Sequence, residues 1–342
     1  MVINMALWIN IVTAAVSFGI SAAVGIFLIP LLKKLHFGQT IEKFVGAKLE
    51  SQKKKQGTPM MGGFMFIIGS LVACAVGFML WRATSDNSLE IGSNTPVFRL
   101  LACIGFALLN GVIGFTDDYI KAVKKQNKGL NPKQKMVMQF VFTSLFLWVL
   151  NLLGDDTKIL LPFFGDVNFG IFYYPLMLLV LIYIVNSINL TDGVDGLCGT
   201  VTVVASLSFV MILSAMKYWE CTIFAVAIAG GCLGFLVWNL HPAKVFMGDT
   251  GSMYLGGSIA ALGMMTGEHL LFFLIAIVYI CEALSVVIQV ISFKTTGKRI
   301  FKMSPIHHHF ELCGWSEYKI VIVFSLVTLA AGVLANVIYF TR

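Results

Sequence analysis

Residues 172–197, FYYPLMLLVLIYIVNSINLTDGVDGL, join an apolar run directly to a cluster of asparagine, aspartate and glycine. The run Phe172–Val185 is long enough for roughly four turns of helix. In Asn186–Leu197, which follows it, Asp192 and Asp195 lie three residues apart, a spacing that lets two side chains share one helical face. The pattern predicts a helix that ends in acidic side chains at a membrane surface. An ordinary hydrophilic loop, in which Asn, Asp and Gly are turn residues, is the alternative.

The composition of the whole chain is that of a protein embedded in a lipid bilayer. Of 342 residues, 58% are hydrophobic and 12% are charged, whereas about 25% of the residues of soluble domains are charged. The apolar runs are continuous over roughly 20 residues, as membrane-crossing helices require, and lack the period-two alternation of membrane barrel strands. The sequence predicts an all-α polytopic membrane protein in which residues 1–342 form one transmembrane domain.

The basic residues between the apolar segments indicate the orientation of the chain. Most of the 24 Lys and Arg residues fall in alternate connections, and the positive-inside rule places that side in the cytoplasm. Both termini are then expected on the periplasmic or extracellular side, and the first segment is too long for the core of a cleaved signal peptide. The net charge of +7 is a topology signal and does not indicate nucleic-acid binding. The ten predicted transmembrane segments are 6–32, 60–81, 97–116, 136–153, 172–190, 198–216, 220–239, 252–266, 270–293 and 317–340.

Two further patterns concern structure. The seven cysteines form no disulfide or zinc pattern. Those inside apolar runs, among them Cys232 and Cys281, are expected to be small buried side chains. The connection Gly154–Gly170 carries three aspartates around Leu-Pro-Phe-Phe-Gly, which predicts a short hairpin or cap on the outer side.

Acidic motifs gather in the connections expected on the cytoplasmic side. Asp117 and Asp118 end the third segment, and adjacent acids at a membrane edge are costly unless they are paired, hydrated or bound to a cation. Two acids at the start of a hydrated loop are the plain alternative. Asp249 lies between a glycine and a threonine in Phe246–Ser252, a setting that suits Mg²⁺, which prefers oxygen ligands.

Together with Asp192 and Asp195, these motifs would bring five carboxylates from three loops to one face. Such a group repels itself unless cations or basic side chains are present. A metal-assisted phosphate site, in which lysines and glycine amides balance the remaining charge, resolves the repulsion.

Three other groups have more than one interpretation. Consecutive histidines fan apart on a helix, so His307–His309 suit contact with phosphate oxygens better than a structural role or ligation of one transition metal. Lys53–Lys55 is either part of a site or only an orientation signal and lipid anchor. Glu282 is an acid inside a transmembrane segment and is expected to face the protein interior, with no assigned role.

The order of five motifs is similar to that in one enzyme family. The chain resembles the bacterial phospho-N-acetylmuramoyl-pentapeptide transferases, of the polyprenyl-phosphate N-acetylhexosamine-1-phosphate transferase superfamily, over essentially its whole length. The histidine motif discriminates best, because the related N-acetylglucosamine-phosphate transferases differ there. The motifs are Lys55-x-Gly-Thr-Pro-x-Met-Gly-Gly, Gly114-Phe-Thr-Asp-Asp-Tyr, Asn186-x-x-Asn-Leu-Thr-Asp-Gly-x-Asp-Gly-Leu, Phe246-Met-Gly-Asp-x-Gly-Ser and Pro305-Ile-His-His-His-Phe-Glu.

The resemblance implies a Mg²⁺-dependent enzyme of the bacterial inner membrane, with its active-site cleft on the cytoplasmic face. It would transfer phospho-MurNAc-pentapeptide from UDP-MurNAc-pentapeptide to undecaprenyl phosphate, which gives lipid I and UMP for peptidoglycan synthesis. The resemblance also implies a homodimer. It implies no binding to nucleic acid.

The same resemblance assigns roles by position in the motifs. Asp249 is the expected Mg²⁺ ligand, and Asp117 and Asp118 are the other catalytic carboxylates. Four residues would form a uridine pocket in which an aromatic ring stacks on the base: Asp195, Asn239, Phe246 and Gln289. The other expected substrate-binding residues are Lys55, Asn189, Asp192, His307, His308 and His309. Met60 departs from the family pattern, which has threonine there, and this puts a hydroxyl contact beside Lys55 in doubt.

Two competing functions differ from this one by substrate or by class. A sister transferase that uses UDP-N-acetylglucosamine is the nearer alternative. A secondary transporter is the more distant one, since transporters place coupling acids near the bilayer midplane and often contain repeated halves. Here the acids gather on one face and no repeat is visible. The sequence leaves open whether transfer is direct or passes through a phospho-enzyme, and which aspartate acts as base.

Overall fold

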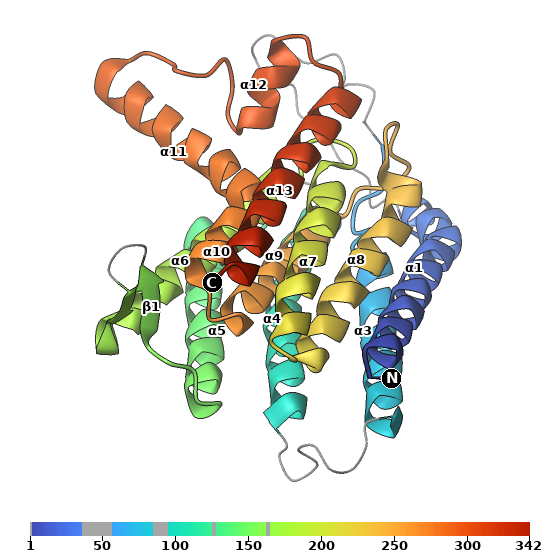
Figure 1. The fold of residues 1–342 in the computed structure, drawn as a ribbon. Helices are drawn as coiled ribbons and strands as arrows, with labels where there is room; N and C mark the ends of the chain where they lie inside the picture. Colours follow the sequence, from blue (N-terminus) through green and yellow to red (C-terminus); the bar gives the residue numbers. More distant parts are fainter. Residues whose placement is uncertain (1, 36–56, 85–94, 125–127, 162–164) are drawn as a thin grey trace.

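The computed structural model describes residues 2–35, 57–84, 95–124, 128–161 and 165–342. Lys53–Lys55 lies outside the described residues. The predicted role of Lys55 therefore stays a prediction. Helices dominate the described chain (Figure 1), which confirms the all-α prediction. The elements are α1 (Val2–Lys34), α3 (Phe64–Thr84), α4 (Thr95–Lys124), α5 (Pro132–Leu152), β1 (Lys158–Leu161), β2 (Gly165–Asn168), η1 (Gly170–Phe172), α6 (Tyr173–Thr191), α7 (Leu197–Ala215), α8 (Trp219–Asn239), α9 (Gly248–Met265), α10 (His269–Ile275), α11 (Ile277–Thr296), α12 (Ile306–Leu312) and α13 (Glu317–Phe340).

Nine helices within the described ranges are long and apolar enough to cross a membrane, and they confirm a polytopic membrane protein. Each of the ten predicted segments falls on a helix or, in one case, a helix pair. Segment 252–266 corresponds to α9, which is not among the nine. Its glycines and serines lower its apolar content, and its residues from Thr250 to Met265 are buried by neighbouring helices. A helix that is enclosed by protein does not need a lipid-facing surface.

The packing of α9 against α4 is the most extensive contact between two elements of the described chain. Gly114 makes this close approach possible, because a Cβ atom added there would lie 2.0 Å from the backbone oxygen of Asp249. The small residue lets the middle of α4 touch the beginning of α9. Asp117 and Asp118 follow three and four residues later on α4, so the same glycine brings both acids to the start of α9.

Helix α11 differs from the prediction in two respects. Segment 270–293 was expected to be one helix, but the structure divides it into α10 and α11 at Ala276, which leaves helical geometry at φ −87° and ψ 7°. From there α11 extends away from the bundle (Figure 1). Cys281 is exposed on α11, so its predicted burial is wrong. Its neighbours Leu284 and Ile291 are also exposed, which is typical of a helix face that contacts lipid.

The predicted hairpin is confirmed by the antiparallel pair β1 and β2, in which Lys158 faces Asn168. We call this end of the bundle, which also holds the chain termini, the hairpin end; α12 lies at the opposite end, the site end (Figure 1). Arg342, at the C-terminus, pairs with Glu268 between α9 and α10 at 2.8 Å. Both termini therefore lie at one end, as alternating helices require.

The orientation of these two ends in the membrane remains a prediction and can be measured. Single cysteines at Asp166 and Thr296, both exposed, would be introduced into a cysteine-free variant. In right-side-out vesicles, an impermeant thiol reagent is expected to label the cysteine at Asp166 and to spare the one at Thr296 until the vesicles are opened. Labelling of the Thr296 position in closed vesicles would place the site end outside the cell.

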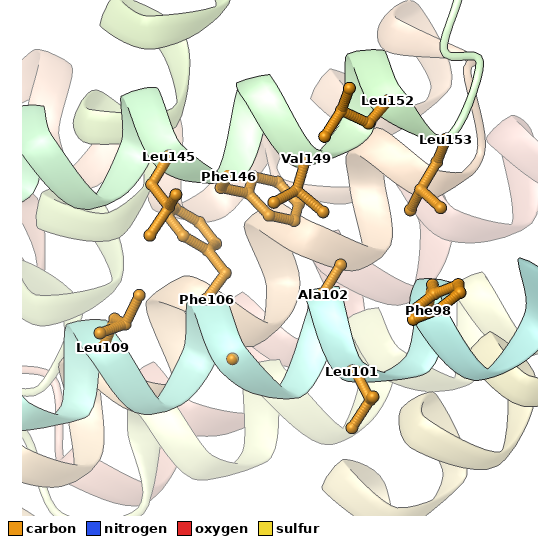
Figure 2. A pocket seen from close by; sticks show the side chains of 11 residues that line it. Phe98, Leu101, Ala102, Phe106, Leu109, Leu145, Phe146, Val149, Leu152 and Leu153 are labelled. Atoms are coloured by element: carbon orange, nitrogen blue, oxygen red, sulfur yellow. The ribbon is translucent and has the colours of Figure 1, made fainter.

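An apolar pocket of about 510 Å³ lies between α4 and α5 (Figure 2). Phe106 and Phe146 stack across it with ring centroids 4.3 Å apart, while Phe98 and Leu152 on its rim are exposed. Its lining contains no charged side chain. The nearest lining residue on α4, Leu109, precedes the acidic pair Asp117–Asp118 by two helical turns, so this pocket is not where the acidic chemistry is located.

Candidate active site

Three carboxylates from two helices meet at the site end. Asp117 and Asp118 come from the last two turns of α4, and Asp249 comes from the first turn of α9. Each offers an oxygen, and these oxygens lie within 4.8 Å of one another. Both α4 acids are buried. The structure therefore brings together the three residues predicted as catalytic carboxylates.

Two lysines balance the charge of this acidic cluster. Lys121 Nζ lies 2.6 Å from Asp117 Oδ2 and 3.2 Å from Asp249 Oδ2. Lys135, on α5, places its Nζ 3.5 Å from the same oxygen of Asp249. Three carboxylates and two ammonium groups thus leave one net negative charge. The predicted need for basic partners is met by residues that had not been singled out, although the spacing of Asp117 and Lys121 is the i,i+4 pairing of a helix.

Asp118 differs from its neighbour because its carboxylate caps α9. Its Oδ1 accepts a hydrogen bond of 3.2 Å from the backbone N–H of Asp249. Its Oδ2 accepts bonds from the N–H of Thr250 at 2.9 Å and from the Thr250 hydroxyl at 2.7 Å. The first N–H groups of a helix have no partner within the helix, and negative charge is favourable there. Asp118 supplies that partner from another helix.

Asp117 presents its carboxylate to the cations. Its Oδ1 accepts a hydrogen bond of 2.7 Å from the backbone N–H of Leu130, and its Oδ2 contacts Lys121. A Cβ atom added at Gly129 would lie 2.4 Å from Asp117 Oδ1, so the backbone at Gly129 and Leu130 lies tightly against this acid. Of the two adjacent aspartates, Asp117 is the one that shares a cation with Asp249.

Asn189 belongs to the same cluster, as predicted. It lies in the last turn of α6, and its Nδ2 donates to Asp249 Oδ1 at 3.1 Å and to Ser252 Oγ at 2.7 Å. Its Oδ1 accepts from Lys135 Nζ at 3.4 Å. Asp249 is therefore held by groups from α4, α5 and α6.

The turn between α6 and α7 does not have the predicted geometry. Helix α6 ends at Thr191 and α7 begins at Leu197, so Asp192 and Asp195 lie in a turn and share no helical face. Asp192 is the C-cap residue of α6 and is partly buried. The five predicted carboxylates all lie at helix ends of the site end, but Asp195 belongs to a different group of side chains from Asp117, Asp118 and Asp249.

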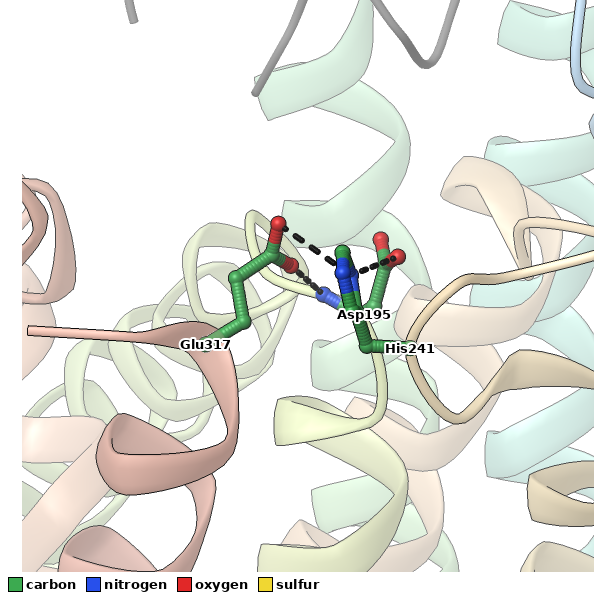
Figure 3. Close-up of side chains that lie close together, drawn as sticks. All are labelled: Asp195, His241 and Glu317. Atoms are coloured by element: carbon green, nitrogen blue, oxygen red, sulfur yellow. Dashed lines mark hydrogen bonds and ion pairs between the residues drawn. The ribbon is translucent and has the colours of Figure 1, made fainter. Parts of the chain in front are cut away.

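Asp195 forms a separate cluster with His241 and Glu317 (Figure 3). His241 Nδ1 lies 3.1 Å from Asp195 Oδ2 and 3.5 Å from Glu317 Oε1. Glu317, at the start of α13, also accepts a 3.0 Å hydrogen bond from the backbone N–H of Asp195. A helix more than a hundred residues along the chain thus holds the turn, which sequence spacing does not reveal.

Two other residues assigned to the uridine pocket adjoin this turn. Asn239 ends α8, and its amide accepts from the N–H of Gly196 at 3.0 Å and donates to the carbonyl oxygen of Val245 at 2.9 Å. It therefore ties the turn to the segment before α9. Phe246 is half-buried in that segment, where Asn239 helps to hold it.

The segment after Lys55 pairs with the backbone of Phe246. The N–H of Phe246 donates to the oxygen of Pro59 at 2.9 Å, and the oxygen of Phe246 accepts from Gly62 at 2.8 Å. Met60, at the position where the family pattern has threonine, is half-buried and packs against the apolar core. Where the family pattern has a threonine hydroxyl, this chain therefore has a methionine side chain that packs against apolar residues next to the site.

Gln289 holds a loop at the far edge of the site end. Its Oε1 accepts from the N–H groups of Ile300 and Phe301, both at 3.0 Å, and its Nε2 donates to the oxygen of Phe301 at 2.9 Å. Its amide is thus bonded to backbone on both sides, and whether it also contacts a nucleotide stays a prediction.

The three histidines of α12 contact three different partners. His307 Nδ1 lies 3.0 Å from Glu282 Oε2, and His308 Nδ1 lies 2.6 Å from Glu311 Oε2. His309 Nδ1 accepts a hydrogen bond from the N–H of Lys302 at 3.1 Å. The side chains fan apart, as consecutive residues on a helix do. The contact to Glu282 gives the intramembrane acid a partner that the sequence had not identified.

The donor set of the acidic cluster fits a hard divalent cation. Asp117, Asp118 and Asp249 offer oxygen atoms only, as Mg²⁺ prefers, and Mg²⁺ needs just one or two carboxylates because it keeps several waters. Asp117 Oδ2 and Asp249 Oδ2 already hold a positive charge between them, the ammonium group of Lys121. The second group, at Asp195, includes an imidazole nitrogen, which is more typical of transition-metal sites.

Comparison with known proteins finds several similar proteins that all carry the same name. Residues 100–267 match the family described as Glycosyl transferase family 4. A phospho-N-acetylmuramoyl-pentapeptide-transferase from Halalkalibacterium halodurans is 46% identical over 327 residues, which cover 95% of this chain and 96% of that one. Proteins of the same name from Bacillus cytotoxicus and Bacillus mycoides are 44% and 46% identical over 326 residues, with the same coverage.

Proposed function

This chain belongs to the phospho-N-acetylmuramoyl-pentapeptide-transferase family, and from that premise we propose how its site end performs the reaction. The enzyme transfers phospho-MurNAc-pentapeptide from UDP-MurNAc-pentapeptide to undecaprenyl phosphate. A phosphate oxygen of the lipid bonds to the phosphorus that carries the sugar. The bond between the two phosphates of UDP breaks, and UMP leaves. The products are lipid I and UMP, and the chain acts in peptidoglycan synthesis.

We locate the reaction at the site end because of one observation, the network of acids and ammonium groups there. It consists of Asp117, Lys121, Asp249 and Lys135. Each ammonium group lies within 3.5 Å of an acid of this network, at the ends of apolar helices. A lipid phosphate reaches this place from the bilayer surface, while a soluble nucleotide arrives from the aqueous side. The proposed site would thus lie at the boundary between the bilayer, which holds the lipid substrate, and the water that dissolves the nucleotide substrate.

The side chains of the cluster have complementary tasks in this proposal. Lys121 and Lys135 bind phosphate oxygens and offset the negative charge that two anionic substrates bring together. Asp117 and Asp249 would hold Mg²⁺, which when bound stabilises the charge that develops on the leaving phosphate. Asn189 orients Asp249. The carboxylate of Asp118 is occupied by its hydrogen bonds to the start of α9, so Asp117 is the better placed of the two neighbouring acids to face the substrates.

The remaining residues would bind the nucleotide substrate. Phe246 would stack on the uracil base, with Asp195, Asn239 and Gln289 around it. Asp192, His307, His308 and His309 would contribute polar contacts, and so would Lys55, which lies outside the described residues. We place the site end on the cytoplasmic face of the bacterial inner membrane and expect a homodimer.

The proposal is tested by UMP release from the full-length enzyme in detergent. We expect release with UDP-MurNAc-pentapeptide and undecaprenyl phosphate, and loss of release without either lipid phosphate or Mg²⁺. UDP-N-acetylglucosamine in place of the first substrate tests for the sister activity and should give no product. Turnover that is unaffected by chelation of divalent cations would refute the metal assignment.

Replacement of Phe246 by alanine tests the stacking role. Loss of a base–aromatic stack is expected to weaken binding of the UDP substrate by roughly 1–3 kcal/mol, while affinity for undecaprenyl phosphate is unchanged. The measurement is calorimetric binding of each substrate to purified enzyme. Phe340→Ala is the matched control, because Phe340 is exposed on α13 at the hairpin end. Unchanged nucleotide affinity in Phe246→Ala would mean that Phe246 only packs.

A further inference from the structure

Glu282 on α11 is a buried acid that, among the described residues, accepts its hydrogen bonds from one histidine of another helix, His307 on α12. Its exposed fraction is 0%, although α11 presents apolar side chains to its surroundings. A carboxylate in such a position is costly unless a partner compensates for its lost hydration. Its Oε2 lies 3.0 Å from His307 Nδ1 and accepts a 3.4 Å hydrogen bond from the His307 backbone N–H. These contacts bind the acid to both the ring and the backbone of His307.

This contact fixes the direction in which the imidazole ring points. When Nδ1 of His307 donates to Glu282, the other ring nitrogen, Nε2, faces away from the carboxylate. Within the described part of the chain, His307 Nε2 is buried without a hydrogen-bond partner. A buried polar atom without a partner costs free energy, and such an atom in a native protein calls for an explanation. A ligand that supplies the missing partner is one.

His307 Nε2 points at the turn that leaves the acidic cluster. A Cβ atom added at Gly193 would lie 2.2 Å from Nε2, so the ring lies against the backbone of this glycine. Gly193 is itself exposed, and it comes four residues after Asn189, which binds Asp249. Nε2 thus lies directly beneath the exposed turn at Gly193, which follows the end of α6 that binds Asp249.

We infer that Glu282 is a positioning residue for the transfer reaction, an inference that rests on the function proposed above. Glu282 holds His307 so that Nε2 donates a hydrogen bond to a phosphate oxygen of the nucleotide substrate. Both ring nitrogens donate only when the imidazole is cationic. In that form the carboxylate of Glu282 is the acceptor for the proton on Nδ1. An acid that does not touch the substrate thereby prepares a histidine that does.

The test is a double-mutant cycle with Glu282→Gln and His307→Ala, read as UMP release by the detergent-solubilised enzyme. Glutamine keeps the size of glutamate, and its amide oxygen still accepts from Nδ1, so the thermal transition should stay near that of the wild type. We expect Glu282→Gln to lower kcat about 10- to 100-fold, as loss of a partner behind a functional histidine does. KM for undecaprenyl phosphate should change less than about twofold. In the His307→Ala background, Glu282→Gln should have almost no further effect, because coupled residues are not additive.

Other outcomes would contradict the inference. Losses that multiply in the double variant would mean that Glu282 acts independently of His307. A Glu282→Gln variant that unfolds, or that loses thermal stability but not kcat, would make Glu282 a structural residue. Glu268→Gln is the control, since Glu268 pairs with Arg342 at the hairpin end and its kcat should be unchanged. Wild-type enzyme without UMP release would refute the proposed function, whereas active wild type with equally active Glu282→Gln would refute only this inference.

Discussion

Replacement of Asp249 by asparagine is expected to lower the rate of UMP release by roughly a thousandfold or more, the scale of losing a central electrostatic group in an active site. Asp249 is the acid on which both lysines converge, and Asn189 donates to its other oxygen. Asparagine keeps the shape of the side chain but removes the charge that would bind Mg²⁺. The substitution therefore tests charge with little change in packing.

The measurement is initial rate against Mg²⁺ concentration for the wild type and Asp249→Asn. The variant should need more Mg²⁺ and should not reach the wild-type rate at any concentration. Asp156→Asn is the matched control, because Asp156 is exposed near the hairpin and pairs only with Lys158 at 2.8 Å among the described acid–base pairs. Wild-type dependence on Mg²⁺ in Asp249→Asn would mean that Asp249 does not hold the metal and that Asp117 holds it without Asp249.

The structure also determines the stability effect expected for the same substitution, which differs from the effect expected for five unpaired acids. Five clustered acids would gain from the loss of one charge. The cluster instead contains three acids and two lysines, and Asp249 is the acidic partner of Lys135 at 3.5 Å. Loss of one partner of a largely buried ion pair is destabilising. We therefore expect Asp249→Asn to lower the thermal transition measured without Mg²⁺, and an unchanged or higher transition would contradict the described pairing.

The features that the sequence predicted correctly follow from local patterns. Continuous apolar runs define the helices, and alternating helices bring every second connection to one end, so Asp117 and Asp249 had to lie at the same end of the bundle. The hairpin near Lys158 was visible as turn residues between short runs. The pairing of Lys121 with Asp117 was within reach of sequence, because i,i+4 neighbours on a helix face each other.

The features that the sequence missed depend on contacts between distant segments. Asp195 leaves the acidic cluster because Glu317, 122 residues away, binds its backbone N–H. Glu282 acquires a role only because α12 folds back over α11. The division at Ala276 has no glycine or proline to mark it. Residue type and spacing predicted which side chains carry chemistry, but their pairing was decided by packing.

The two adjacent aspartates of α4 should respond very differently to the same substitution, although the sequence assigned both to catalysis. In Asp118→Asn, one of the two carboxylate oxygens becomes an amide NH₂ group. Oδ1 faces the N–H of Asp249, and Oδ2 faces both donors of Thr250. In either orientation the amide therefore places a donor against a donor. We expect a loss of roughly 2–4 kcal/mol of stability, because a buried, charge-assisted hydrogen bond is lost and its former partner is left unsatisfied.

In Asp117→Asn the loss of activity should be greater and the loss of stability smaller, because Lys121 keeps Asp249 as an acidic partner at 3.2 Å. The amide oxygen of asparagine can still accept from the N–H of Leu130, now at 2.7 Å from Oδ1, and the NH₂ group then replaces the oxygen that contacts Lys121. The comparison is thermal unfolding in detergent alongside UMP release for both variants. We expect Asp118→Asn to unfold at the lower temperature and Asp117→Asn to have the greater loss of rate per folded molecule. Equal stability of the two variants would contradict the capping of α9 by Asp118, because the cap is the feature that distinguishes these neighbouring acids.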